Sequence, residues 1–467
     1  MLDLNSLKSE FSTASGVYRV YSEIRYQENR KLLLVLNNGE LETNLTDTTR
    51  GVSSRSFTGG YWGFSSYSNP SKDSALSSLR ESTRNAKFLA GRSEKNAATI
   101  AFSQMGKFEK SYASAKSPMS TAIWLEFLKF LDAMIARKYP DLKSRQLLLQ
   151  ALDIEKHLVT SDGQEIHTMV PRAHFTVSMT KGTKHGPVHF QDTRGGLGQL
   201  QDHFLVNPET LESWIDEIYQ MTTRKAEGIA PTAGSRDVIL APDLAAIIMH
   251  EAIGHATEAD LVLAGSVAAD QIERMIGSPL ISFTDFAHTY AGAPCPQPVH
   301  VDDEGIQAEN TTIIQGGVLK SYMNNRETAM HFEQKPTGHA RAFTHADEPL
   351  IRMRNTVVHP GQSKVDDMIS SIEDGYYLMK AGKGQADTTG EFMFAVGTGF
   401  EIKNGKLGRV LRDTSISGLA FDMLKSVSMV GNEFKWDTSG YYCTKKQPMP
   451  VGVGSPAIKC RVRVGGN

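Results

Sequence analysis

Apolar residues recur at helical spacing in three segments of the first half of the chain. Residues 73–90 and 208–226 each carry an apolar stripe, and a third stripe follows Ser117-Pro118 and ends before Pro140. Apolar positions three and four residues apart lie on one face of a helix, so each segment predicts an amphipathic helix packed on the core. Serine and then proline suit the cap and the first residue of a helix, which predicts the start of the middle helix at Ser117-Pro118.

Alternating patterns and tight-turn residues predict strands around these helices. Leu32–Leu36 is an apolar run followed by Asn37-Asn38-Gly39, and asparagine and glycine tolerate the positive φ of a two-residue hairpin turn. The return strand is therefore expected at Glu40–Leu45. Residues 144–180 alternate around a turn at Gly163 and predict two or three antiparallel strands.

The second half of the chain is richer in strands and turns. Gln315-Gly316-Gly317 and Asn404-Gly405 each separate two apolar runs and predict hairpins. We expect an α+β protein with an N-terminal α/β region over 1–230 and a mainly antiparallel β-rich domain over 231–467 that carries one buried helix. The polar stretch 91–116 is typical of a linker and would divide the N-terminal region into two subdomains.

Length and charge limit the classes of protein that fit. At roughly 150 residues per domain, 467 residues suggest two or three domains with a large core. The chain has 50 Lys and Arg against 52 Asp and Glu, a net charge of −2, which excludes a generally basic nucleic-acid binder. The glycine cluster at 59–63 lacks the GxGxxG spacing of a dinucleotide site, so no such cofactor is predicted.

No pattern of secretion or membrane insertion is present in the sequence. The first sixteen residues lack the apolar segment of a signal peptide, and no run of 18 or more uncharged apolar residues occurs. Cys295, Cys443 and Cys460 are too few for a disulfide framework, and their odd number favours a reducing compartment. We therefore expect a cytoplasmic protein with no membrane partner.

The strongest chemical signal lies just past the middle of the chain. Val238–Ala241 predicts a short strand, and Pro242-Asp243 ends it and starts a helix, with the proline in the first position or the aspartate as cap. The next residues are almost all apolar, which predicts a buried helix, yet it carries His250, Glu251 and His255. Polar groups on a buried helix need a shared partner, and a cation is the simplest one.

The spacing of the two histidines predicts a distorted helix. In the zinc-protease motif HExxH the histidines are four residues apart and face the same way. Here the pattern is HExxxH, and at roughly 100° per residue five steps put the two rings about 140° apart. Both rings can reach one ion only through a π-type turn or a helix end, which we predict between Ile253 and His255. Glycine at position 254 lowers the cost of that distortion.

A catalytic zinc site has three protein ligands and one open position for water. Glu251 follows a ligand directly, so we expect it to serve as general base rather than as ligand. The third ligand must then come from Glu258 or Asp260 nearby, or from a distant cysteine. Cys443 lies in a polar, turn-rich stretch, where a loop thiolate can reach a metal, and the other two cysteines have weaker claims.

Two other interpretations of the same residues stay open. The histidines could be core residues that bond to the backbone. Two histidines and a cysteine with a weak axial methionine also describe a blue-copper site, and Met249 and Met449 lie near the candidate ligands in sequence. Glu251 has no purpose in a copper site, which favours the hydrolytic interpretation.

Long motifs in a fixed order connect the chain to a known family. They are RSFTGGYWGFSS (55–66), HEAIGHATEAD (250–260), VDDEGIQAENTTIIQGGVLKSYMNNRETA (301–329), TGHARA (337–342), TTGEFMF (388–394) and PMPVGVGSP (448–456). With these motifs the chain resembles the TldD/PmbA family of zinc metalloproteases, also labelled modulators of DNA gyrase, over nearly its whole length. No feature of composition or motif supports a gyrase-binding role.

The resemblance implies a set of site residues, a cofactor and partners. It implies Zn²⁺ held by His250, His255 and Cys443, with Glu251 as catalytic base. It implies a C-terminal domain with a curved sheet that carries the HExxxH helix, and a dimer enclosing a cavity, either with a second copy or with a PmbA/TldE-like subunit. The implied activity is hydrolysis of unfolded or short peptides. The alternative within the family is a non-catalytic partner subunit that binds peptide.

Overall fold

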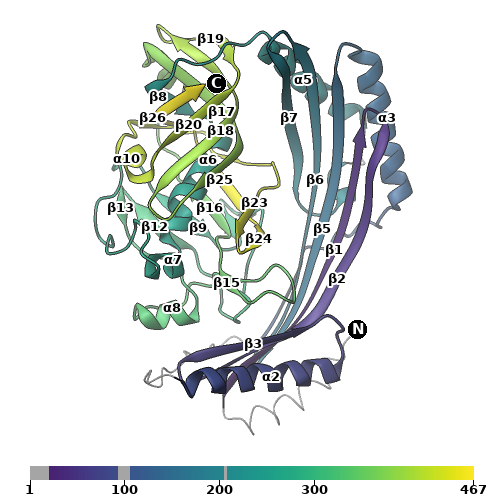
Figure 1. Cartoon of the computed structure of the whole chain (residues 1–467), viewed down its shortest axis with the longest axis vertical. Helices are drawn as coiled ribbons and strands as arrows, with labels where there is room; N and C mark the ends of the chain where they lie inside the picture. The colour runs from purple at the N-terminus through teal and green to yellow at the C-terminus, as the bar shows by residue number, and fades with distance from the viewer. Residues whose placement is uncertain (1–19, 93–105, 205–207, 467) are drawn as a thin grey trace.

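Helices and strands are mixed along the chain, which makes this an α+β protein (Figure 1). The structure, a computed structural model, describes residues 20–92, 106–204 and 208–466. The N-terminal strands form one long sheet, and the shorter C-terminal elements gather beside it. No helix in the described ranges is long and apolar enough to cross a membrane.

Seven strands form the N-terminal sheet, in the order β3-β2-β1-β5-β6-β4, with β7 also paired to β6. They are β1 (Tyr21–Asn37), β2 (Glu40–Thr58), β3 (Tyr61–Tyr67), β4 (Lys107–Ser111), β5 (Ser144–Thr160), β6 (Glu165–Thr183) and β7 (Gly186–Leu197). The predicted turn at Asn38 and Gly39, with φ of 52° and 87°, and the predicted pair around Gly163 are confirmed. The strands are longer than predicted, 17 residues in β1 and 19 in β2, because polar residues continue them past the apolar runs.

Three helices pack on this sheet, and all three were predicted. They are α2 (Lys72–Ala90), α3 (Thr121–Lys138) and α5 (Glu212–Ala226), with the short α4 (Leu200–His203) before α5. The predicted start of α3 at Ser117-Pro118 is wrong, because the cap is Ser120. In sequence, Ser117 and Ser120 both fit the cap pattern. The structure uses Ser120 as the cap, although its side chain makes no capping hydrogen bond.

The predicted linker 91–116 is in part a strand. β4 lies within it and pairs in parallel with β6, while 93–105 lie outside the described residues. This edge strand is Lys-Phe-Glu-Lys-Ser, with a single apolar residue, so it shows no run or stripe in the sequence.

The C-terminal half contains a small closed barrel. Its strands are β8 (Gly234–Leu240), β26 (Ile458–Gly466), β20 (Thr414–Leu419), β18 (Glu391–Lys403) and β17 (Asp374–Ala386), and β17 pairs with both β8 and β18, which closes the ring. β19 (Lys406–Leu411) forms the predicted Asn404-Gly405 hairpin with β18. Most pairs are antiparallel as predicted, but β8 and β17 are parallel.

A second sheet of six strands lies beside the barrel in the order β13-β12-β9-β16-β25-β22. Its members are β9 (Phe283–Phe286), β12 (Thr311–Gln315), β13 (Val318–Leu319), β16 (Asn355–Val358), β22 (Lys435–Trp436) and β25 (Gly452–Ser455). The β12–β13 pair is the predicted hairpin at 315–317. The short helices α7 (Ala259–Leu263), α8 (Arg326–His331) and α10 (Ala420–Lys425) lie beside these sheets (Figure 1), and α9 (Val365–Ser370) precedes β17.

Buried and half-buried ion pairs join the N-terminal sheet to the C-terminal half. Arg55 Nη1 on β2 lies 2.8 Å from Glu304 Oε1, and Lys156 Nζ on β5 lies 2.6 Å from Asp303 Oδ2. Arg25 Nη1 on β1 lies 3.4 Å from the same Asp303 oxygen. Arg55 begins the first motif quoted above and Glu304 belongs to VDDEG, so these two distant motifs supply the two sides of one contact.

Asp285 and Arg354 form a fully buried ion pair beside β16, with Arg354 Nε 2.7 Å from Asp285 Oδ1. Burial alone would raise the pKa of Asp285, but Arg354 holds it well below its usual value. We expect Asp285→Ala to lower the free energy of unfolding by about 3–5 kcal/mol, measured in urea, because the Arg354 cation stays buried without its carboxylate. Since the folded pKa is depressed, this contribution is present above the unfolded pKa of about 3.9 and is lost in more acid solution.

The matched control is Asp374→Ala, whose carboxylate pairs at 2.6 Å with the exposed Lys403. That variant should change the unfolding free energy much less, because exposed ion pairs are screened by solvent. Equal losses in the two variants would contradict the prediction.

Candidate metal centre

The histidine-bearing helix has the kind of distortion that the sequence predicts, but it begins earlier than the predicted position between Ile253 and His255. It runs as α-helix over Pro242–Ile248, continues as π-helix over Met249–Gly254 and ends as a 3-10 turn over His255–Thr257. Pro242 is the first helical residue and Ala241 the cap, so Asp243 is not the cap. The wider π-turn brings side chains five residues apart to the same side.

Gly254 is needed for a different reason from the one that the sequence suggested. Its φ is −57°, an ordinary helical value that any residue adopts. A Cβ at this position would lie 2.2 Å from the sulfur of Met353, so a larger residue would require the Met353 side chain to move. The glycine lets the π-turn pack closely against the segment that leads into β16.

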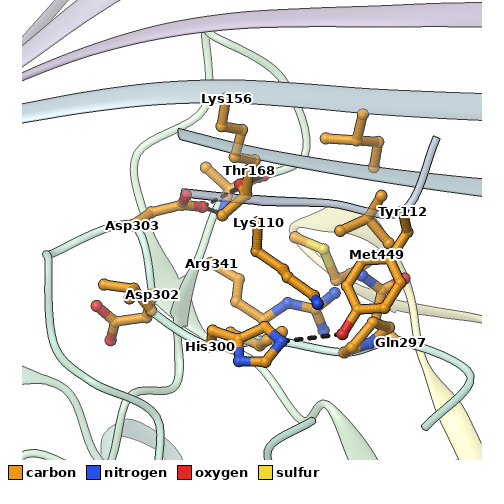
Figure 2. Close-up of a pocket in the computed structure, with 16 residues that line it drawn as sticks. Lys110, Tyr112, Lys156, Thr168, Gln297, His300, Asp302, Asp303, Arg341 and Met449 are labelled. Atoms are coloured by element: carbon orange, nitrogen blue, oxygen red, sulfur yellow. Dashed lines mark hydrogen bonds and ion pairs between the residues drawn. The ribbon is translucent and has the colours of Figure 1, made fainter. Parts of the chain in front are cut away.

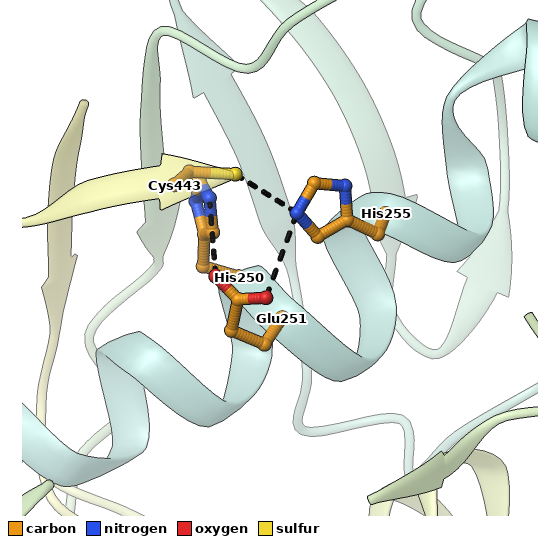
Figure 3. A group of neighbouring side chains, drawn as sticks. All are labelled: His250, Glu251, His255 and Cys443. Carbon is orange, nitrogen blue, oxygen red and sulfur yellow. Dashed lines mark hydrogen bonds and ion pairs between the residues drawn. The ribbon is translucent and has the colours of Figure 1, made fainter. Parts of the chain in front are cut away.

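Four side chains meet at this turn (Figure 3). Cys443 Sγ lies 2.9 Å from His255 Nε2, and Glu251 Oε2 lies 3.5 Å from the same nitrogen. Glu251 Oε1 lies 3.9 Å from His250 Nε2. One ligand atom from each of the four falls within 4.8 Å of all the others, a spacing that suits a single ion. The structure therefore brings all four predicted site residues together.

Each imidazole is held through its other nitrogen. His250 Nδ1 lies 3.0 Å from the Thr356 hydroxyl on β16, and His255 Nδ1 lies 2.7 Å from Glu258 Oε2. Glu258 also pairs with Lys445 at 3.1 Å. Burial alone would raise the pKa of Glu258, but Lys445 and then His255 lower it to about 2, so it is a carboxylate. Such partners fix the ring orientation and leave both Nε2 atoms facing the centre.

Glu258 and Asp260 thus lie outside the group of four. Glu258 contacts the far nitrogen of His255, and Asp260 pairs with Lys445 at 3.0 Å. Their position favours Cys443 as the third ligand among the three candidates.

Cys443 is buried in a strand, so the prediction of a flexible loop cysteine is wrong. It lies in β23 (Tyr442–Lys445), which pairs with β24 (Gln447–Pro450). The buried Arg352 donates to the carbonyl oxygens of Cys443 at 2.8 Å and of Gln447 at 2.6 Å. The polar residues and prolines of this hairpin are typical of a loop, which explains the wrong prediction. In the structure, Arg352 hydrogen-bonds to both strands of the hairpin and joins them.

The donor set fits a metal ion. His250 Nε2 is buried and has no hydrogen-bond partner among the described residues. Burial, followed by His255, lowers the pKa of His250 to about 3, so its ring is neutral and can donate a lone pair. A buried imidazole nitrogen that faces a thiol, a carboxylate and a second imidazole is the arrangement that a bound cation satisfies.

The sequence did not reveal Tyr441, which contacts the candidate base. Its hydroxyl donates to Glu251 Oε1 at 3.0 Å, and its ring stands edge-on to His250. Tyr441 comes two residues before Cys443 and directly before β23, so only its nearness to the candidate ligand in sequence could have singled it out. Thr356 carries no signal in sequence, because only the tertiary fold brings β16 to the helix.

A separate pocket lies between the N-terminal sheet and the loop at 297–303 (Figure 2). None of the four candidate residues lines it. Two of its charged groups, Lys156 and Asp303, pair with each other, and the Tyr112 hydroxyl lies 2.9 Å from His300 Nε2. Met449, the cross-strand partner of Cys443, forms part of its wall, so this pocket and the metal centre share one hairpin.

Two imidazoles and a thiol beside a carboxylate, on an α+β framework, are typical of a metal-dependent hydrolase. Comparison with known families gives the particular family. Residues 233–466 match the model described as the PmbA/TldA metallopeptidase C-terminal domain, and residues 22–90 match the model of domain 1. The chain belongs to the PmbA/TldD family of metallopeptidases and is a metalloprotease.

Similar proteins come from archaea and bacteria. A zinc metalloprotease TldD homolog of Saccharolobus solfataricus is 34% identical over 272 residues, which cover 58% of this chain and 59% of that protein. A metalloprotease of Methanothermobacter thermautotrophicus is 28% identical over 451 residues, covering 96% of this chain and 95% of that protein.

Solved structures show the same fold. A protein of Thermotoga maritima named as a modulator of a DNA gyrase gives a TM-score of 0.80 at 17% identity, covering 99% of this chain and 100% of that one. TldE from Thermococcus kodakarensis gives a TM-score of 0.75 at 15% identity, covering 98% of this chain and 100% of that one.

Proposed function

We propose that the chain is a zinc-dependent metalloprotease that hydrolyses unfolded or short peptides. His250, His255 and Cys443 are the metal ligands in this proposal, and Glu251 is the catalytic base. The observation that carries it is the buried Nε2 of His250, which has no hydrogen-bond partner in the described part of the chain and faces the other three groups. Zinc is the metal because thiolate and imidazole ligands suit it, and the Saccharolobus solfataricus relative carries zinc in its name.

A bound zinc ion would supply a Lewis acid that polarises the scissile carbonyl and lowers the pKa of water. Glu251 is placed to take the proton of the attacking water and to pass it to the leaving amine. The hydrogen bond from Tyr441 to Glu251 Oε1 holds this carboxylate in place, and Oε2 is the oxygen nearer His255.

Burial of the centre supports an extended substrate. The side chain of His250 is fully buried, and those of Glu251 and His255 are 16% and 17% exposed. A folded domain cannot approach groups this enclosed, whereas an extended peptide can pair its backbone with a strand edge. Residues 231–467 would act as the catalytic domain, and residues 1–230 as a wall of the substrate cavity in a homodimer or in a heterodimer with a TldE-like subunit.

Metal removal tests the proposal. The purified chain should cleave casein, lose that activity after dialysis against a chelator, and recover it when zinc is restored, because no other described group at the centre activates water. Cleavage that persists in metal-free protein would overturn the proposal. A zinc-loaded chain that cleaves only after mixing with a TldE-type subunit would establish the heterodimer, and one that never cleaves would favour the non-catalytic alternative.

A further inference from the structure

A second group of metal-binding side chains lies on the N-terminal sheet, far in sequence from the first. His157 on β5 is the direct cross-strand partner of His167 on β6, and Glu109 on β4 is the partner of His167 on its other side. Directly paired residues point to the same face of a sheet, as does Glu155, two positions before His157. The four residues therefore form one cluster across three strands.

The cluster lies between two helix-covered parts of that face. Val159 packs with Leu79 of α2, and Leu149 packs with Leu131 of α3. Glu155 and His157 lie between these positions on the same side of β5, where their side chains are 26% and 18% exposed. An ion can therefore reach the cluster from solvent, while neighbouring strands hold it in a fixed frame.

Three ligand atoms converge in the cluster. The rings of His157 and His167 are stacked, with centroids 4.0 Å apart and planes within 6°. Glu155 Oε1 lies 3.1 Å from His167 Nε2 and 3.8 Å from His157 Nε2, so both nitrogens face one carboxylate oxygen. One ligand atom from each of the three residues falls within 4.8 Å of the others, as in the first centre. Two nitrogen ligands of a tetrahedral zinc lie about 3.4 Å apart. Because the two ring planes are nearly parallel, at least one ring must turn out of the stack for both lone pairs to point at one ion.

The remaining atoms of these ligands have partners of their own. His167 Nδ1 lies 3.2 Å from Glu109 Oε1, and Glu155 Oε2 accepts from Arg30 Nη1 at 2.8 Å. Metal-ligating histidines usually donate their other ring nitrogen to a carboxylate. Metal-ligating carboxylates usually accept a hydrogen bond on their other oxygen. The same support occurs at the first centre, where Glu258 holds His255 through Nδ1.

We propose that His157, His167 and Glu155 form a second site for a divalent transition-metal ion. The ligand atoms are the two Nε2 atoms and Oε1 of Glu155, with one position left for water. Two imidazoles and one carboxylate select Zn²⁺ and its neighbours over Mg²⁺ and Ca²⁺, which prefer oxygen ligands. The ion would join β5 to β6 and, through Glu109, hold the edge strand β4.

Zinc titration of the chelator-treated full chain tests this site. The parent protein should bind two zinc ions per chain. Cys443→Ser should keep only the ion at His157 and His167. His157→Ala or His167→Ala should keep only the ion at Cys443. Glu109→Gln should keep both ions but bind the ion at His157 and His167 roughly 10–100-fold more weakly, because Glu109 supports a ligand without being one. The matched control is His185→Ala, which removes an exposed histidine on the loop between β6 and β7. This variant should bind two zinc ions per chain.

Substitution of zinc by cobalt distinguishes the two sites by absorption, and it also shows whether the Cys443 centre of a variant is still folded. Co²⁺ next to Cys443 carries a thiolate charge-transfer absorption, which an ion held by nitrogen and oxygen lacks. His157→Ala should keep this absorption and lose the second equivalent, and His157→Asn should do the same. A parent chain that binds one ion, lost in Cys443→Ser, would overturn the second site, as would two ions retained in the His157 and His167 variants. An empty Cys443 centre would not affect the count at His157, so the two proposals can fail separately.

Discussion

Glu251→Gln is expected to leave zinc bound and to slow peptide cleavage by roughly 10²–10⁴-fold, the usual contribution of a general base. Glutamine keeps the size of the side chain and can still accept the hydrogen bond from Tyr441, so the centre should hold its shape. An amide cannot take a proton from water near neutral pH, so only the proton transfer is lost. Zinc content and the initial rate of casein cleavage, measured on the same sample, separate the two effects.

Two further variants sharpen that result. Glu273→Gln changes an exposed carboxylate of the same half of the chain, paired with Lys320 at 2.7 Å, and should cleave at the parent rate. Tyr441→Phe removes the hydroxyl that holds Glu251 and should reduce the rate by less than Glu251→Gln does. Undiminished turnover in Glu251→Gln, with zinc present, would show that Glu251 is not the base.

The helix of the metal centre was predictable because its signal is local. Apolar residues up to the first histidine predict burial, and the five-residue step from His250 to His255 fixes an angle that only a distorted helix can correct. The π-turn over Met249–Gly254 confirms that inference. The crowding of Gly254 by Met353 was not predictable, because the two residues meet only in the folded chain.

Long-range supports leave no trace in a single sequence. Cys443 resembles a loop residue until Arg352, 91 positions away, is seen to bond to its carbonyl oxygen. Thr356 reaches the centre from β16, and Tyr441 reaches it from the residue before β23. His157 and His167 look like two unrelated histidines until the register of β5 and β6 pairs them. Sequence patterns thus predict elements and local motifs, while strand register decides which side chains meet.

Cys443→Ser is expected to remove one zinc ion per chain and, with it, peptide cleavage. A serine hydroxyl stays neutral near pH 7 and is a poor zinc ligand, so two imidazoles would remain where a catalytic site needs three ligands. Metal analysis after dialysis, together with loss of the cobalt–thiolate absorption, measures the change. The fold should persist, because Arg352 bonds to the backbone of residue 443 and not to its sulfur.

Cys460→Ser and Cys295→Ser are the matched controls, because both cysteines are buried and neither belongs to the group of four. Burial raises the pKa of each of these thiols to about 12, so both stay protonated and are poor metal ligands. Both variants should keep their zinc and their activity. If Cys443→Ser behaved as these two do, the thiolate would not be a ligand, and Glu258 would be the next residue to test because it already contacts His255.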